Sequence, residues 1–131
     1  MCYNLLGSDL YLSKINIKSV LKSQKETVKY EGKGIKNKNR IVFNEKAVKT
    51  AIDIKNKIII ERKEEYYLKI VFSKQKKEEG KYITKYGNLK IETYTKELKI
   101  EENKFKIKYD LIINEHFIDT FEYNFEYSID S

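Results

Sequence analysis

The sequence predicts an all-β protein, built as an antiparallel up-and-down β-barrel of about 8–10 strands. Three observations support this prediction. Apolar and polar residues alternate with period 2 over much of the chain, polar turn segments recur at intervals of about ten residues, and no segment shows a convincing helical period. Closure into a barrel would remove unpaired strand edges and leave an interior that is filled by side chains or holds one small ligand.

The chain of 131 residues has the length of one domain. We expect residues 15–131 to form a single barrel domain and residues 1–14 to be a lead-in segment, helical or loose up to residue 12. The N-terminus lacks the basic start and long apolar run of a signal peptide, and no stretch reaches the roughly 20 apolar residues that span a bilayer. The sequence therefore predicts a cytoplasmic protein without membrane association.

Four strands are expected in the first half of the chain, over residues 15–22, 27–35, 40–45 and 51–55. Gly32 and Gly34 lie two residues apart on one face of the second of these strands. Glycines placed in this way predict sharp coiling or a close approach of another backbone.

Five strands are expected in the second half, over residues 58–63, 66–73, 89–100, 105–113 and 117–129. Gly87 predicts a tight turn or a positive φ just before the third of them. Within 89–100 the apolar residues change parity, since Leu89 and Ile91 share one parity and Leu98 has the other. This change predicts a β-bulge near Lys96 and Glu97.

The last two strands have the clearest alternation, from Phe105 to Ile113 and from Phe117 to Ile129. A three-residue loop at 114–116 would place Ile113 opposite Phe117. In that register Lys108 faces Glu122 and Lys104 faces Glu126, so opposite charges would pair across the hairpin. The edges at 15–22 and 117–129 are expected either to pair with each other or to pair across a dimer, so the chain is a monomer or a homodimer.

The net charge of +7 allows two interpretations. Lysine supplies nearly all of the positive charge, with Arg40 and Arg62 as the two arginines. The lysines are either a solvated surface or an outer face, over residues 14–99, that binds nucleic acid or another acidic partner. On such a face Tyr67 and Tyr94 are the aromatic residues expected to point outward.

The residue types that catalytic and metal sites need are scarce. His116 is the one histidine and Cys2 the one cysteine, so a zinc site or a Ser/Cys–His pair has no partners in sequence. Gly32 and Gly34 lie within a strand and not in a phosphate-binding loop. We therefore expect no metal, no cofactor and no enzymatic activity.

A polar set on the inward faces of the strands is the main functional signal. Arg62 follows the alternation of Ile58 and Ile60, so its side chain is expected inside the barrel, where a cation can meet a carboxylate or phosphate. The alternative is that Arg62 pairs with Asp110 or Glu92, or extends to solvent. The residues expected to line a ligand pocket are Arg62, Tyr66, Thr93, Thr95, Tyr109 and Tyr123.

Two functions of different class follow from these patterns. The first is a non-catalytic barrel that binds a small, partly polar or anionic molecule in its interior. The alternative is an interaction module that binds nucleic acid or an acidic partner through the lysine-rich outer surface. The tyrosines are also compatible with plain core packing.

Several segments, in this order, carry a resemblance to a known family. They are Lys-Ser-Val-Leu at 18–21, Ile-Ile-Ile-Glu-Arg at 58–62, Tyr-Ile-Thr-Lys-Tyr-Gly at 82–87, Leu-Lys-Ile-Glu-Thr at 89–93 and Phe-Lys-Ile-Lys-Tyr-Asp-Leu at 105–111. On these segments the chain resembles the YwiB-like family of uncharacterised bacterial proteins. The resemblance implies a calycin-type, lipocalin-like barrel and no established activity. Lys85 stands where the family commonly has proline, and Glu64 where it tends to have glycine.

Overall fold

The computed structural model describes residues 2–5 and 10–130, and the side chains from residue 12 onward. It consists of β-strands and turns, so the predicted all-β, lipocalin/calycin-like fold class is confirmed. The strands are β1 (Cys2–Leu5), β2 (Leu10–Lys22), β3 (Thr27–Asn37), β4 (Arg40–Glu45), β5 (Val48–Ile54), β6 (Ile58–Lys63), β7 (Tyr67–Phe72), β8 (Lys77–Glu79), β9 (Lys81–Thr84), β10 (Gly87–Leu89), β11 (Ile91–Ile100), β12 (Lys104–Ile113) and β13 (His116–Ile129).

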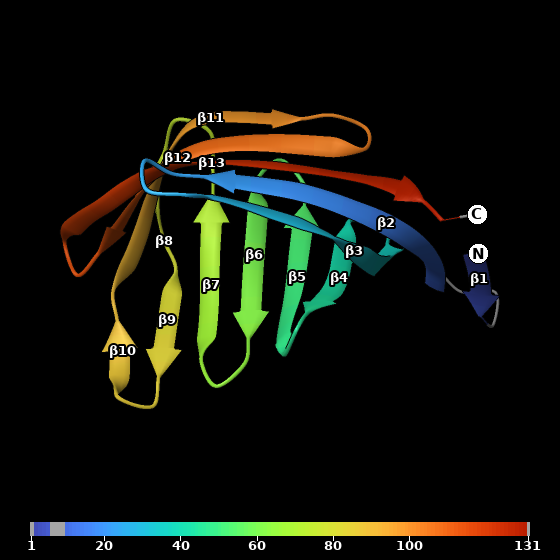
Figure 1. Ribbon diagram of the computed structural model, residues 1–131, viewed down its shortest axis with the longest axis horizontal. Helices are drawn as coiled ribbons and strands as arrows, with labels where there is room; N and C mark the ends of the chain where they lie inside the picture. Colours follow the sequence, from blue (N-terminus) through green and yellow to red (C-terminus); the bar gives the residue numbers. More distant parts are fainter. Residues whose placement is uncertain (1, 6–9, 131) are drawn as a thin grey trace.

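All these strands belong to one antiparallel sheet, which runs β10-β9-β7-β6-β5-β4-β3-β2-β13-β12-β11-β8, with β1 paired to β2. Figure 1 shows the sheet curling over itself, with β2 and β11–β13 crossing above β4–β7. β2 and β13 pair along Ile15–Lys22, so these two edges join within the chain, as one of the two predicted alternatives required. The result is a curled half-barrel.

The two ends of the curled sheet meet where β7 approaches β11. The Thr93 hydroxyl donates a hydrogen bond of 2.7 Å to the Val71 carbonyl, and the backbone N–H of Gln75 donates one of 2.8 Å to the Thr95 carbonyl. This seam holds the sheet in its curl. It also decides which inward residues have open space in front of them.

The strand count exceeds the predicted 8–10, because short strands form where the sequence shows little alternation. The segment from β8 to β10 is one such region, and β1 is another. The expected helical or loose lead-in is wrong for Cys2–Leu5 and Leu10–Lys14, which are strand; residues 1 and 6–9 lie outside the described residues. Pairing with the edge of β2 gives the β1 backbone the hydrogen bonds that a loose segment would leave to water.

The hairpin of β12 and β13 has the predicted register with a different loop. Lys108 faces Glu122 and Lys104 faces Glu126, but the turn has two residues, Asn114 and Glu115, both with positive φ. A bulge at Ile118 then restores the offset that the expected three-residue loop would have produced. The ion pair of Glu122 is diagonal, to Lys106 at 3.3 Å.

Three further backbone predictions are confirmed. The register of β11 against β12 shifts between Thr95 and Glu97, which is the expected bulge. Gly87 has φ of 128°. A Cβ on Gly34 would lie 2.9 Å from the Val42 carbonyl oxygen, so this glycine allows a close backbone approach.

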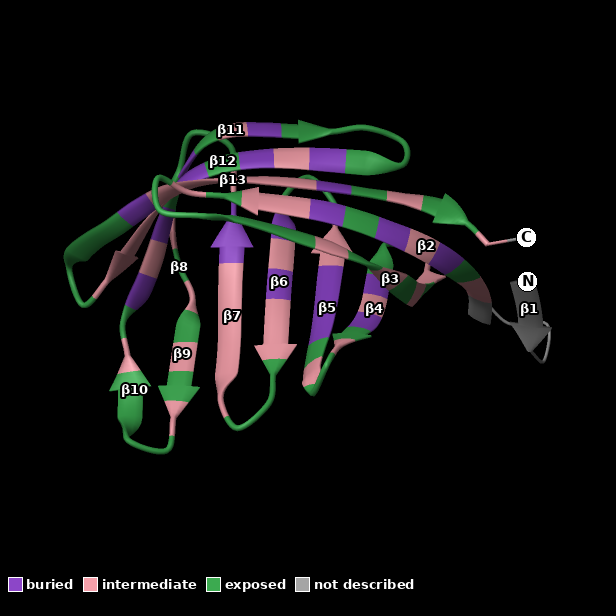
Figure 2. Ribbon diagram, in the orientation of Figure 1, coloured by how far each residue is buried: buried purple, intermediate pink, exposed green. Residues whose placement is uncertain are grey.

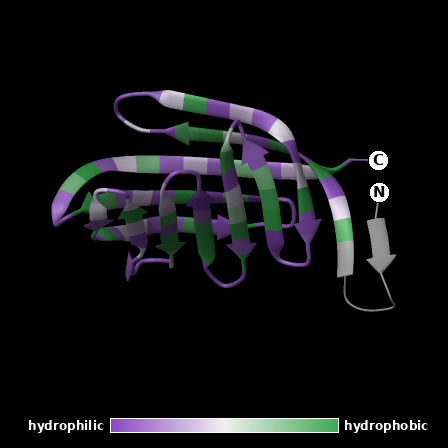
Figure 3. Cartoon of the chain, turned by 90° about the horizontal axis from the view of Figure 1, so that it is seen from below, coloured by the Kyte–Doolittle hydropathy of each residue, from purple (hydrophilic) through white to green (hydrophobic). Residues whose placement is uncertain are grey.

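The core lies inside the curl, where the inward side chains of both halves meet. Figure 2 shows buried residues in the strands of both halves. Figure 3 shows the alternation of hydrophobic and hydrophilic residues along the strands that produces this core. Its buried members are Ile15, Ile17, Ile41, Phe43, Ile52, Ile58, Ile60, Phe72, Leu98, Phe105, Ile107, Tyr109 and Phe125. Phe117 and Ile129, expected on the inward face of β13, are exposed. The bulge at Ile118 puts Phe117 opposite Ile112, off the inward row, and Ile129 is the last residue of the strand. Within the described residues, no helix has the length and apolar character needed to cross a membrane.

Candidate ligand-binding site

A cavity of about 150 Å³ lies at one end of the curled sheet, beside the packed core. A cavity of about this volume in a protein core accommodates benzene, so the space suits a molecule with few non-hydrogen atoms. Its apolar wall is formed by Leu21, Val28, Phe43, Ile60, Leu68, Ile70 and Phe72. Its polar residues are Ser19, Tyr30, Glu45, Thr50, Arg62, Tyr109 and Tyr123.

The cavity exists because β3 diverges from β4. These strands pair over Gly34–Asn37, whereas β2 and β3 pair as far as Thr27. Val28 and Tyr30 therefore lie over the ends of β4–β7, on a part of β3 that does not pair with β4. A Cβ on Gly32 would lie 2.1 Å from the Tyr30 hydroxyl, so the missing side chain at Gly32 lets the Tyr30 ring lie along β3.

Arg62 lies at the cavity as its sequence parity predicts. It is directly opposite Thr50 on β5 and Leu68 on β7, and it shares the inward face with Ile60. The predicted alternative partners are occupied elsewhere, since Asp110 pairs with Lys96 and Glu92 with Lys77 and Lys90. Among the described residues, Arg62 makes no ion pair or side-chain hydrogen bond.

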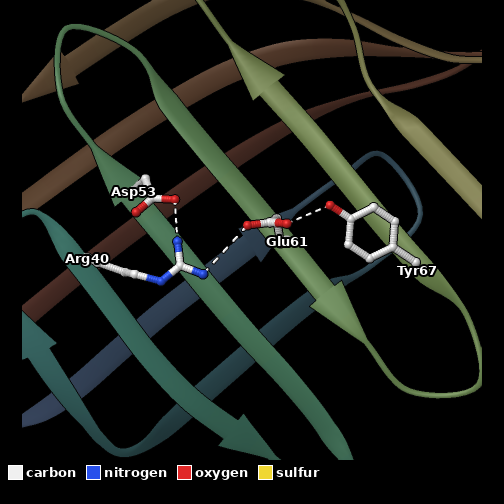
Figure 4. Close-up of polar contacts among 4 residues, drawn as sticks. All are labelled: Arg40, Asp53, Glu61 and Tyr67. Atoms are coloured by element: carbon white, nitrogen blue, oxygen red, sulfur yellow. Dashed lines mark hydrogen bonds and ion pairs between the residues drawn. The ribbon is translucent and has the colours of Figure 1, made fainter.

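Arg40 provides the contrast on the outer face of the sheet (Figure 4). Its guanidinium contacts Asp53 at 2.6 Å and Glu61 at 3.6 Å, and Glu61 also accepts a hydrogen bond of 2.5 Å from the Tyr67 hydroxyl. This hydrogen bond, aided by burial, raises the pKa of Tyr67 to about 12, and it lowers the pKa of Glu61. One arginine is thus fully partnered, and the other faces the cavity.

Thr50 places a second unpartnered polar group beside Arg62. Its side chain is 4% exposed, and its Oγ1 has no hydrogen-bond partner in the described structure. A buried hydroxyl without a partner is costly unless a bound molecule satisfies it. Because Thr50 and Arg62 are directly opposed across β5 and β6, both can address the same oxyanion.

Two tyrosines form the opposite side of the cavity. Burial raises the pKa of Tyr109 well above its usual range, with the Arg62 charge acting in the other direction. Burial also raises the pKa of Tyr123 to about 12, opposed by a hydrogen bond with Ser19 and by the Arg62 charge. Both therefore present neutral hydroxyl groups, which donate and accept hydrogen bonds, throughout the physiological range.

The structure divides the six predicted site residues into three groups. Arg62, Tyr109 and Tyr123 meet at the cavity. Thr93 and Thr95 are inward and buried as expected, but they lie at the seam with β7 and not on the cavity wall. Tyr66 packs against Tyr82 with ring centroids 6.0 Å apart and lines a separate surface groove.

Four polar residues of the cavity were missed by sequence reasoning: Ser19, Tyr30, Glu45 and Thr50. The alternation that identified Arg62 could have identified two of them. Thr50 shares the parity of buried Ile52, and Glu45 shares the parity of Ile41 and Phe43. Polar residues on an apolar face were a usable signal at both positions.

Comparison with known families gives a match over most of the chain. Residues 14–125 match the model of the domain of unknown function DUF1934. The chain belongs to this family. A search of curated proteins found no match.

One solved structure is similar in fold to the chain, the crystal structure of ywiB protein from Bacillus subtilis. The two share 16% sequence identity and a TM-score of 0.62, over 94% of this chain and 98% of that one. With the family match, this confirms the resemblance to the YwiB-like family. At this identity the likeness establishes the fold alone, so any function has to be argued from the cavity.

Proposed function

We propose that this protein is a non-catalytic binding protein that holds a small, partly polar molecule with an oxyanion, a carboxylate or phosphate, in the cavity between β2–β7 and β12–β13. The observation that supports it is the pair Arg62 and Thr50. Both are unpartnered among the described residues and directly opposed on neighbouring strands. Their donors would bind the oxyanion, and the apolar wall would cover the rest of the ligand.

Binding is favoured over catalysis by the chemistry of the cavity wall. The described residues that line it include no histidine or cysteine, and the tyrosines near Arg62 hold their protons at neutral pH. These groups can bind and orient an anion, and the described lining residues include no nucleophile–histidine pair. We expect a cytoplasmic protein.

The outer face gives the nucleic-acid alternative less support. Tyr67, one of the two aromatics predicted to point outward, donates its hydroxyl to Glu61 beside Asp53 and Arg40. Tyr67 and Arg40 are therefore held by carboxylates and do not form a free aromatic and basic surface. Several lysines are also paired with acids, such as Lys33 with Asp130 and Lys106 with Glu122.

The test uses pentanoate as a carboxylate probe that fits the cavity. Isothermal titration calorimetry should detect saturable binding to the wild-type protein and to Arg40→Met, which changes an arginine on the outer face. Arg62→Met should weaken binding at least tenfold, because a hydrogen bond to a charged group contributes about 1.5–3 kcal/mol. Native mass spectrometry of protein purified from its own host should reveal a bound small molecule. The proposal would be refuted by equal affinity for the wild type and Arg62→Met.

A further inference from the structure

Glu45 gives the cavity a negative charge as well as a positive one. It is the last residue of β4 and shares the inward face with Phe43, and its side chain lines the cavity and is half-buried. Among the described residues, the Glu45 side chain makes no ion pair or hydrogen bond. It differs in this from acidic residues outside the cavity such as Glu61 and Glu122, which both have cationic partners.

The two charges lie at separate places on the wall. Phe43, Thr50 and Arg62 form one row across β4, β5 and β6, and Glu45 lies two residues further along β4, opposite Val48. With strands about 4.8 Å apart and a rise of about 3.4 Å per residue, the Cα atoms of Glu45 and Arg62 are about 12 Å apart. Thr50 stands between Phe43 and Arg62 in this row, and the lining also includes apolar side chains such as Phe43 and Ile60.

Both charges nevertheless act on the same enclosed space. Burial is the main cause of the raised pKa of Tyr123, the Arg62 charge opposes it, and the Glu45 charge adds to it. The Tyr123 hydroxyl is therefore within electrostatic reach of both groups.

We infer that the ligand is a small zwitterion, with its oxyanion at Arg62 and Thr50, an ammonium group at Glu45 and an apolar linker between them. This inference rests on the proposed function. A purely anionic ligand would leave Glu45 uncompensated and would meet its repulsion in a site of low dielectric constant. A molecule with opposite charges at its two ends satisfies both groups, and methylene groups suit the apolar wall between them.

The test compares pentanoate with 5-aminopentanoate, which adds one ammonium group at the far end of the same chain. The wild-type protein should bind 5-aminopentanoate about tenfold more tightly in calorimetric titrations, since a hydrogen-bonded charge pair contributes about this much. Glu45→Gln should remove the advantage and retain pentanoate binding. Glu61→Gln, which changes a carboxylate on the outer face, should preserve the advantage. L-norvaline, an isomer with both charges on one carbon, should bind more weakly than 5-aminopentanoate.

The outcomes distinguish the zwitterion from the oxyanion-binding function on which it rests. Equal affinity for pentanoate and 5-aminopentanoate would overturn the zwitterion, and so would a preference for 5-aminopentanoate that survives Glu45→Gln. In either case, Arg62-dependent binding of pentanoate would still support the oxyanion site. Tighter binding of L-norvaline would overturn the two-ended arrangement. Failure of all three probes to bind at millimolar concentration would overturn both.

Discussion

Replacing Arg62 with methionine should stabilise the fold while it weakens binding. The guanidinium faces the cavity without a partner among the described residues, next to the unpartnered hydroxyl of Thr50. Methionine keeps the length and the apolar contacts of the arginine stem and removes the charge. A site that is held ready for a ligand is expected to cost stability in the empty protein, and this substitution measures that cost.

The magnitude follows from the environment of the side chain. An unpaired buried polar group costs about 1–3 kcal/mol in mutational series, and since Arg62 is half-buried we take the low end, about 1 kcal/mol. An unfolding entropy of about 2.1 cal/mol/K per residue converts this, for a chain of 131 residues, into a rise of about 4 °C in Tm.

Arg40→Met is the matched control, because Arg40 has the partners that Arg62 lacks. It loses ion pairs to Asp53 and Glu61, each contributing about 0.2–1 kcal/mol at a partly exposed position, so its Tm should fall. Urea denaturation followed by circular dichroism gives both free energies of unfolding, provided that m is unchanged. A loss of stability in Arg62→Met at least as large as in Arg40→Met would mean that Arg62 is a structural residue, and the reasoning would be refuted.

Three further predictions test other parts of the structure. Thr50→Val should raise the free energy of unfolding by about 1–3 kcal/mol, because it removes a buried hydroxyl without a partner, and it should weaken pentanoate binding. Thr93→Val, which loses the hydrogen bond to the Val71 carbonyl, should instead lower the free energy of urea unfolding by about 1–2 kcal/mol and leave binding unchanged. Gly80→Ala should cost about 3 kcal/mol or more, because its Cβ would lie 2.0 Å from a carbonyl oxygen of β7; wild-type stability in thermal denaturation would contradict this. Stability should fall as the pH rises above about 10. Tyr123, with a pKa raised to about 12, keeps its proton in the folded state, whereas the unfolded chain loses it. Denaturation between pH 8 and 11 should show this decline, and Tyr123→Phe should reduce it.

The hairpin of β12 and β13 shows how a prediction can be right in register and wrong in detail. The pairing of Lys108 with Glu122 is as expected, although the loop is one residue shorter and a bulge at Ile118 compensates. Alternation fixes which residues share a face, and charge complementarity favours their alignment. Neither distinguishes a longer loop from a tight turn followed by a bulge, since both give the same offset between the strands.

The fold class, most strand positions and the inward orientation of Arg62 could be predicted from the amino-acid sequence. These are local properties, because the period of 2 along a strand decides the face to which each side chain points. The same rule placed Thr93 and Thr95 inward, and both are buried.

Which inward residues have space in front of them depends on the tertiary fold. β11 meets β7, so the Thr93 hydroxyl binds the Val71 carbonyl at a closed seam. β3 leaves β4 beyond Gly34, so Thr50 and Arg62 face a cavity. This difference depends on how far the curled sheet brings distant strands together, and alternation within one strand carries no information about that distance.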